Sequence, residues 1–105
     1  MVSLLSPTPQ LRGQVRIPNK MHYVYILLSL KDKNIYTGFT SDLKKRYQEH
    51  LGGKVASTKN RHPLKLIYYE AYANESDARN REKYLKAGGK AKTELKLQIK
   101  ESLNI

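Results

Sequence analysis

Residues 22–51 read HYVYILLSLKDKNIYTGFTSDLKKRYQEHL and predict two strands followed by a helix. Its opening segment, residues 22–29, is rich in aromatic and β-branched side chains and is apolar on both faces, which is typical of a central strand. A polar turn over residues 31–34 separates it from a second apolar run at residues 35–39. The two runs therefore predict a β-hairpin.

A helix is predicted directly after the hairpin, over residues 42–51. Its apolar side chains recur every four residues and so share one face: Leu43, Tyr47 and Leu51. Residues 40–42 supply candidates for its N-cap, and the glycines at positions 52 and 53 end it.

The rest of the chain predicts one more strand and two more helices. A polar, basic loop at residues 54–62 leads to a strand over residues 64–72. Acidic side chains at residues 75–77 favour the start of a helix that runs to about residue 87, and a last helix is predicted over residues 91–103. The order is β-β-α-β-α-α. This predicts an α/β (α+β) fold with a small, three-stranded, mainly antiparallel sheet flanked by helices.

Length and composition predict one folded unit. A chain of 105 residues is the size of a single domain, and we assign it to residues 21–105. Residues 1–20 carry three of the four prolines and no acidic residue, so we expect a flexible N-terminal tail, with a transit-type leader as the alternative.

Charge and residue usage narrow the function. The chain has 20 Lys+Arg against 9 Asp+Glu, a net charge of +11 that favours a polyanionic partner. Because cysteine is absent, disulfides, thiol nucleophiles and thiolate metal sites are excluded. No apolar run is long enough to span a membrane, and no phosphate-binding glycine motif of nucleotide-cofactor enzymes is present.

The predicted hairpin carries a group of tyrosines. Tyr25 belongs to the first strand and Tyr36 to the second, and both phenols are candidates to face one pocket. Gly38 lies two residues after Tyr36 and leaves room on the same face for a ligand or a neighbouring group. The alternative is that these tyrosines only pack in the sheet.

The two helices after the hairpin each carry candidate site residues. Arg46 and His50 are four residues apart on one helix face, where a guanidinium and an imidazole can act together on a phosphodiester. Glu82 occupies an inward position between Ala78 and Leu85, which suits a hard divalent cation. The alternative is an ion pair of Glu82 with Arg79, Lys83 or Lys86.

Together these residues resemble the GIY-YIG nuclease superfamily. The tripeptides Tyr23-Val24-Tyr25 and Tyr36-Thr37-Gly38 match its paired signature, and the run YTGFTSDLKKRYQEH resembles the segment that follows. The closest likeness, over about residues 21–92, is to small stand-alone members. The excinuclease C-subunit branch differs, because it has a lysine where this chain has Phe39. The family's asparagine near the end of the metal helix also has no clear counterpart.

The resemblance implies a metal-dependent endonuclease that cuts DNA with low sequence specificity, with a role in DNA repair or processing. It implies Tyr25 as the base, Tyr36 as an orienting group, Arg46 as the charge-stabilising group and His50 beside the reacting phosphate. Glu82 would hold Mg²⁺ or Mn²⁺. Structured or single-stranded DNA is the expected substrate, and RNA is the open alternative.

Basic side chains near the predicted site are expected to bind the nucleic-acid backbone. The members of this group are Lys44, Lys45, Lys54, Lys59, Arg61 and Lys65. We expect a monomer or weak dimer in the cytoplasm, with nucleoid association as a variant of that location. The rival functions are a nucleic-acid-binding protein with the same fold that does not cleave, and a basic ribosome-associated protein.

Overall fold

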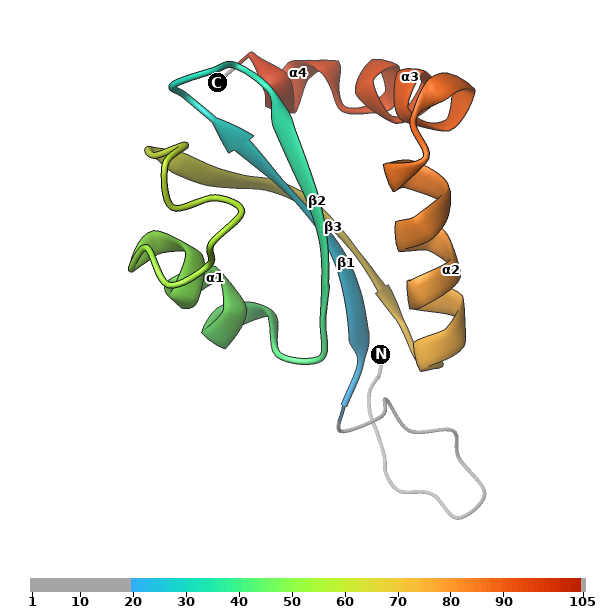
Figure 1. Cartoon of the computed structure of the whole chain (residues 1–105). Helices are drawn as coiled ribbons and strands as arrows, with labels where there is room; N and C mark the ends of the chain where they lie inside the picture. The colour runs from blue at the N-terminus through green and yellow to red at the C-terminus, as the bar shows by residue number, and fades with distance from the viewer. Residues whose placement is uncertain (1–19, 105) are drawn as a thin grey trace, which may run out of the picture.

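Three antiparallel strands form the sheet at the centre of the structure: β1 (His22–Ser29), β2 (Ile35–Thr40) and β3 (Leu64–Tyr72). Their order is β2-β1-β3, so β1 is the central strand and β2 and β3 are the two edges. The computed structural model describes residues 20–104, so the predicted tail lies outside the described residues except for Lys20. The predicted three-stranded α+β fold is confirmed (Figure 1).

The strand register decides which side chains of the hairpin meet. Tyr25 pairs with Gly38, and Leu27 pairs with Tyr36. Because side chains of a strand alternate between its faces, all four positions belong to the same face of the sheet. On the other side of β1, the pairing with β3 is interrupted by a register shift at Ile26 and Leu27.

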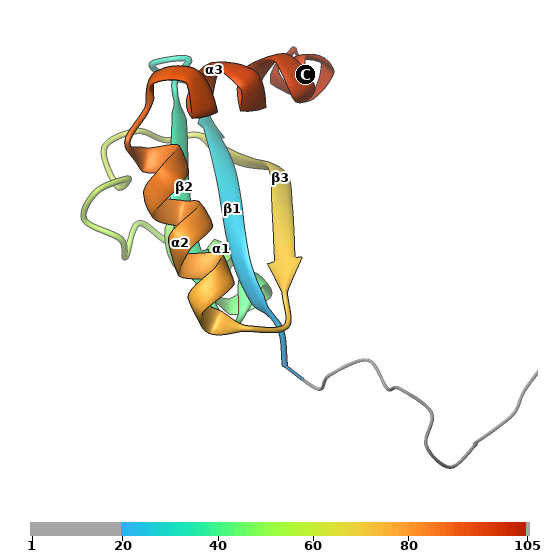
Figure 2. The same cartoon turned by 90° about the vertical axis from the view of Figure 1, so that its right-hand side faces the viewer.

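Helices cover both faces of the sheet (Figure 2). Helix α1 (Leu43–Leu51) lies on one face, and α2 (Glu75–Lys86) lies on the other, followed by α3 (Gly89–Gln98) and α4 (Lys100–Leu103). The side chain of Asp42 caps α1 by accepting a hydrogen bond from the amide of Lys45, and Asn74 caps α2 in the same way through Ser76. β2 is an edge strand of the sheet, with α1 on one of its faces and α2 on the other.

Each face of the sheet has its own hydrophobic core. The core under α2, α3 and α4 contains Val24, Ile26, Leu28, Ala78, Leu85 and Leu95 among its buried members. The core under α1 contains Tyr25, Leu27 and Leu64, with Tyr36, Leu43, Tyr47 and Leu66 packed against them. The candidate tyrosines therefore belong to the smaller core, on the α1 side.

The C-terminal helical segment is bent, which the sequence pattern did not predict. One helix was expected over residues 91–103, whereas the segment begins at Gly89 and breaks at Ile99. The buried Ile99 keeps its amide hydrogen bond to the carbonyl of Leu95, but its φ of −110° and ψ of 25° leave the helical region. The bend allows Leu103 to pack against the same core as Ile99.

Within residues 20–104, no helix combines the length and the apolar character that crossing a membrane requires.

Candidate active site

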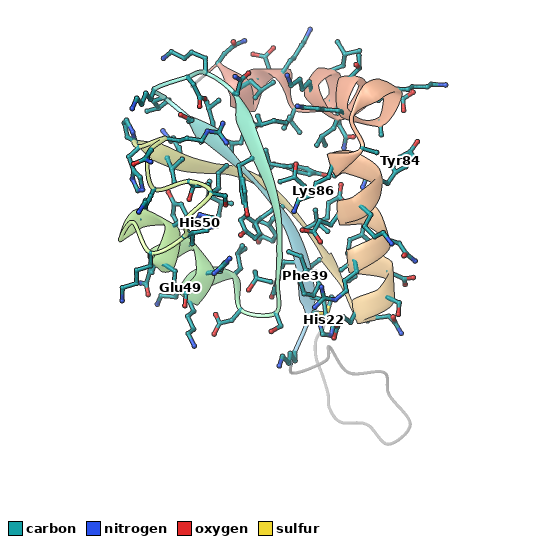
Figure 3. All side chains as sticks on the ribbon, viewed as in Figure 1. His22, Phe39, Glu49, His50, Tyr84 and Lys86 are labelled. Atoms are coloured by element: carbon teal, nitrogen blue, oxygen red, sulfur yellow. The ribbon has the colours of Figure 1, made fainter. Side chains whose placement is uncertain are left out.

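Two tyrosines and a histidine meet on the α1 face of the sheet, next to the β2 edge. The ring of His50 from α1 lies 5.6 Å from the ring of Tyr25 and 5.2 Å from that of Tyr36, measured between centroids. The two tyrosine rings are 6.3 Å apart. In Figure 3, His50 of α1 and Lys86 of α2 lie on either side of β2.

A chain of hydrogen bonds runs through His50. Its Nε2 atom lies 2.7 Å from the phenol oxygen of Tyr25, and its Nδ1 atom lies 2.7 Å from the hydroxyl of Thr58. The Thr58 hydroxyl also donates to the carbonyl of Val55 at 3.5 Å. With the hydroxyl proton assigned to Val55, Nδ1 carries the imidazole proton and Nε2 accepts from Tyr25.

Burial sets the protonation states of this pair. Desolvation, with a smaller contribution from the positive charge of Arg46, lowers the pKa of His50 to about 4, so the imidazole is neutral near pH 7. Desolvation also raises the pKa of Tyr25 to about 12, although the guanidinium of Arg46 opposes this shift. A neutral imidazole therefore faces a protonated phenol.

Gly38 makes space for Tyr25. A Cβ atom built on Gly38 would overlap the Cζ and hydroxyl of Tyr25 and would lie 2.7 Å from its Cε2. We expected the space to lie beside Tyr36, on the same strand. The structure shows that it serves the paired residue on the neighbouring strand, because Tyr25 lies across the register from Gly38.

Arg46 lies at the rim of this cluster. Its Nη1 atom is 3.0 Å from Glu49 Oε1, and 37% of its side chain is exposed. The carboxylate of Glu49, and to a lesser degree the phenol of Tyr25, raise the pKa of the guanidinium. Arg46 thus combines a fixed positive charge next to the Tyr25 phenol with access to solvent.

Glu82 approaches the same region from α2. Its side chain is only 16% exposed, and its Oε2 atom lies 2.9 Å from Lys86 Nζ. Its negative charge contributes, as the smallest of the causes, to the raised pKa of the Tyr25 phenol. The ammonium of Lys86 lies 6.0 Å from the ring centroid of Tyr36. Glu82 and Lys86 therefore face the tyrosines from the α2 side of β2.

The donor set around Glu82 fits a magnesium ion better than a transition metal. No group of three or more His, Asp or Glu side chains able to hold a metal ion occurs in residues 20–104. Mg²⁺ requires few protein ligands, since it typically takes one or two carboxylates and completes its shell with waters and substrate phosphate. The single, mostly buried carboxylate of Glu82 matches that requirement.

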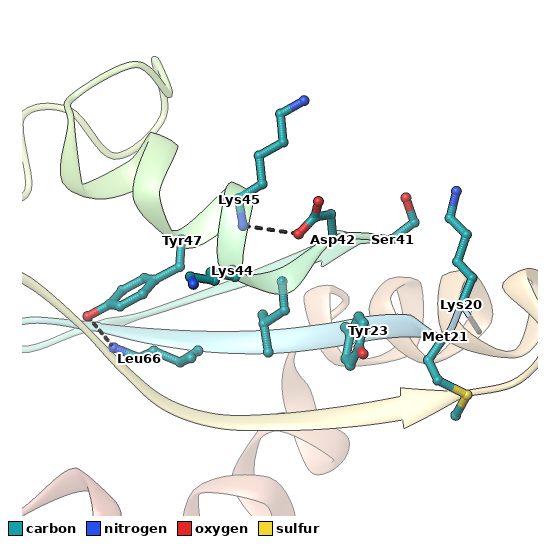
Figure 4. Close-up of a pocket in the computed structure, with 10 residues that line it drawn as sticks. Lys20, Met21, Tyr23, Ser41, Asp42, Lys44, Lys45, Tyr47 and Leu66 are labelled. Carbon is teal, nitrogen blue, oxygen red and sulfur yellow. Dashed lines mark hydrogen bonds between the residues drawn. The ribbon is translucent and has the colours of Figure 1, made fainter. Parts of the chain in front are cut away.

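The residues expected to bind the nucleic-acid backbone lie in three different settings: a groove, an exposed surface and an ion pair. Lys44 and Lys45 line a shallow groove of about 890 Å³ at the start of α1, together with Lys20 (Figure 4). Lys54, Lys59 and Lys65 are exposed on the following loop and on β3. Arg61 makes a two-pronged ion pair with Asp32, with N–O distances of 2.6 and 3.1 Å, and so ties the loop to the β1–β2 turn.

Thr58 is the site residue that the sequence pattern did not indicate. It lies in the loop that was predicted to be polar and exposed, but its side chain is fully buried against His50. Its neighbour Val55 is buried as well, and the amides of Thr58 and Lys59 both bond to the Val55 carbonyl. In the sequence, the apolar Val55 three residues before Thr58 is a weak signal that this part of the polar loop turns inward.

Three comparisons with known proteins show what the chain is similar to. The family model described as the GIY-YIG catalytic domain matches residues 21–95. The chain is 43% identical over 86 residues to a UPF0213 protein of Clostridium perfringens, which covers 81% of this chain and 88% of the relative. It is 39% identical over 70 residues to a UPF0213 protein of Haloquadratum walsbyi, covering 66% and 78%. A solution NMR structure of a UPF0213 protein from Bacillus halodurans, 34% identical, matches with a TM-score of 0.48 over 76% of this chain and 85% of that one.

Proposed function

The chain belongs to the GIY-YIG catalytic-domain family, and from this premise we propose that it is a divalent-metal-dependent endonuclease that hydrolyses DNA phosphodiester bonds with low sequence specificity. One observation carries the proposal. The phenol of Tyr25 lies 2.7 Å from His50 Nε2 in a space that only a glycine at position 38 leaves open. Purely structural packing does not require this arrangement.

Tyr25 and His50 form a two-step proton relay in this mechanism. The Tyr25 side chain is almost fully buried, so the attacking water must enter from the solvent-exposed Arg46 rim; it gives its proton to the phenol oxygen as the phenol gives its own proton to His50 Nε2. A phenol with a pKa of about 12 is a poor base by itself, so the neutral imidazole is needed to receive the proton. The bound phosphate adds negative charge near His50, which favours the protonated imidazole.

Arg46 and Tyr36 act on the phosphate. The exposed part of the Arg46 guanidinium binds phosphate oxygens and stabilises the charge that develops on them during attack. The Tyr36 ring lies against His50 and limits where the phosphate and water can lie. Restricting the water to the Tyr25 side raises the fraction of productive encounters.

Glu82 is the residue that would hold the metal ion. When bound, the ion supplies Lewis-acid stabilisation of charge on the scissile phosphate. Lys86 already provides a positive charge at Glu82 Oε2, so this oxygen lies where a cation is stabilised. The ammonium of Lys86 must move away from that oxygen for Glu82 to accept a cation there.

One specific observation favours the second candidate, a nucleic-acid-binding protein that does not cleave. The 2.9 Å ion pair between Glu82 and Lys86 satisfies the carboxylate without a metal ion. In that case the basic side chains would bind DNA or RNA backbone, and Glu82 would only stabilise α2.

A substrate panel separates the two candidates. Plasmid, branched and single-stranded DNA and a matched RNA are incubated with the full chain and Mg²⁺ or Mn²⁺, and the products are resolved on denaturing gels. Cleavage of DNA that stops when the metal is chelated supports the endonuclease. Salt-dependent binding of the same substrates without any product supports the non-cleaving candidate.

A further inference from the structure

A small cleft lies beside Tyr36 on the α2–α3 side of β2, and the proposed chemistry does not use it. Its volume is about 210 Å³, and its lining residues are Ile35, Tyr36, Thr37, Leu85, Lys86 and Lys92. Ile35 and Leu85 belong to the buried core, so the polar groups of the cleft come from the other four residues. None of the lining residues is acidic, and the cleft is therefore suited to an anion.

Lys92 is the most unusual member of this cleft. It is half-buried, and among residues 20–104 no carboxylate lies within ion-pair distance of its ammonium. Lys90, two residues earlier on the same helix, has a side chain that is 84% exposed and lies 4.0 Å from Glu94. A partly desolvated ammonium without an acidic partner gains more from a bound anion than a fully solvated one does.

Lys86 connects the cleft with the candidate active site. Its Nζ atom lies 2.9 Å from Glu82 Oε2 and 6.0 Å from the centroid of the Tyr36 ring. The Tyr36 ring also lies 5.2 Å from the His50 ring. One side chain, Tyr36, thus separates the cleft from the His50 side of the site.

We propose that this cleft binds one of the two phosphodiesters that flank the scissile phosphate, with Lys92 as its main cationic contact. The inference rests on the proposed function, because it places a second phosphate of the same strand next to the reacting one. Thr37 adds a neutral hydroxyl donor to the lining residues of the cleft. The subsite carries the strand over the β2 edge toward α3, a direction that the lysines of α1 do not cover.

The test measures binding without cleavage. A fluorescently labelled, single-stranded DNA oligonucleotide is titrated with the full chain in EDTA at several salt concentrations, using wild type, Lys92→Gln and the control Lys90→Gln. Loss of a direct phosphate contact lowers the slope of log K against log salt by about one. We expect this for Lys92→Gln, with affinity reduced roughly two- to fivefold, and a smaller change for Lys90→Gln.

A second arm locates the contact on the strand. A single neutral methylphosphonate linkage is moved along the oligonucleotide, and its cost in affinity is measured with both variants. At the linkage that Lys92 contacts, we expect the combined loss of binding free energy to be smaller than the sum of the losses from the methylphosphonate and from Lys92→Gln. With Lys90→Gln, the two losses should add at every linkage.

The outcomes separate the subsite from the proposed function. Equal salt slopes for the two variants, or additive costs at every linkage, overturn the subsite. If the wild type binds no oligonucleotide, both proposals fail. If Lys92→Gln behaves as expected but the wild type never cuts DNA with Mg²⁺ or Mn²⁺, the cleft binds a backbone phosphate, whereas the endonuclease proposal and the place of that phosphate beside a scissile one both fail.

Discussion

The phenol oxygen of Tyr25 lies 2.7 Å from His50 Nε2, although the two residues are 25 positions apart in the chain. Tyr25 belongs to the central strand and His50 to α1, and both side chains are almost fully buried, at 1% and 0% exposure. The bond thus connects the sheet to the helix on its α1 face. Removing either group leaves a buried polar atom of the other without its partner.

Replacing Tyr25 with phenylalanine tests the relay. Tyr25→Phe keeps the ring in the core but removes the group that takes the proton from water. We expect DNA cleavage under single-turnover conditions to fall by about 10²–10⁴-fold. Tyr23→Phe is the matched control, since it removes a phenol from the same strand and should change the rate little. Equal rates for wild type and Tyr25→Phe would contradict the relay.

Replacing Thr58 tests how His50 is oriented. Thr58→Val keeps the shape of the side chain but leaves Nδ1 without its partner, so we expect about 1–3 kcal/mol lower free energy of unfolding and slower cleavage. Nitrogen NMR of the imidazole should report the Nδ1–H tautomer in wild type and in Thr58→Ser, and a mixture in Thr58→Val. A retained Nδ1–H tautomer in Thr58→Val would show that Thr58 does not set it.

Adding a methyl group at Gly38 tests the space it leaves for Tyr25. Because the new Cβ overlaps the phenol, Gly38→Ala must displace Tyr25 from His50. We expect about 1–3 kcal/mol of destabilisation in urea unfolding, together with loss of cleavage. Gly52→Ala is the control. Its new Cβ would lie 3.3 Å from the carbonyl oxygen of Gln48, its nearest neighbour, and outside the tyrosine cluster. Unchanged stability and activity in Gly38→Ala would contradict the overlap.

The pH dependence of stability tests the burial of His50. Burial lowers its pKa from 6.5 to about 4, so between these values the unfolded chain binds more protons than the folded chain. The free energy of unfolding should therefore fall as pH decreases from about 6.5 toward 4, by up to about 3 kcal/mol.

A variant isolates this contribution from other titrating groups. His50→Gln should show a flatter pH profile of urea unfolding than wild type across that window. The carboxyls of Asp32 and Glu70 also have lowered pKa values, but their contribution is lost only below their ordinary values of 3.8 and 4.5. Identical slopes for wild type and His50→Gln between pH 5 and 6.5 would contradict a buried, neutral histidine.

The sequence pattern predicted the central strand of the sheet because a strand that is apolar on both faces must be covered on both sides. Residues 22–29 are apolar on both faces, and β1 is indeed the strand covered on both sides. The bend at Ile99 was not predictable in the same way. The spacing of Ala91, Leu95 and Ile99 fits a straight helix equally well, and the bend depends on where the core accepts Leu103.

The candidate site was predictable only where its residues lie on regular elements. The helical spacing of Arg46 and His50 and the strand positions of Tyr25 and Tyr36 follow from local periodicity. Thr58 does not, because its burial depends on how a loop folds back over α1. The pairing of Gly38 with Tyr25 also depends on hairpin register, which a polar turn of residues 31–34 specifies only loosely.

The most direct test of the account is the rate of DNA cleavage as a function of Mg²⁺ concentration for three chains. These are wild type, Glu82→Gln and the control Glu75→Gln, which neutralises an exposed carboxylate on the same helix. We expect metal-dependent cleavage by wild type and Glu75→Gln, and loss of cleavage in Glu82→Gln with DNA binding retained. Equal cleavage by Glu82→Gln and wild type, or no cleavage by wild type at any Mg²⁺ concentration, would contradict it.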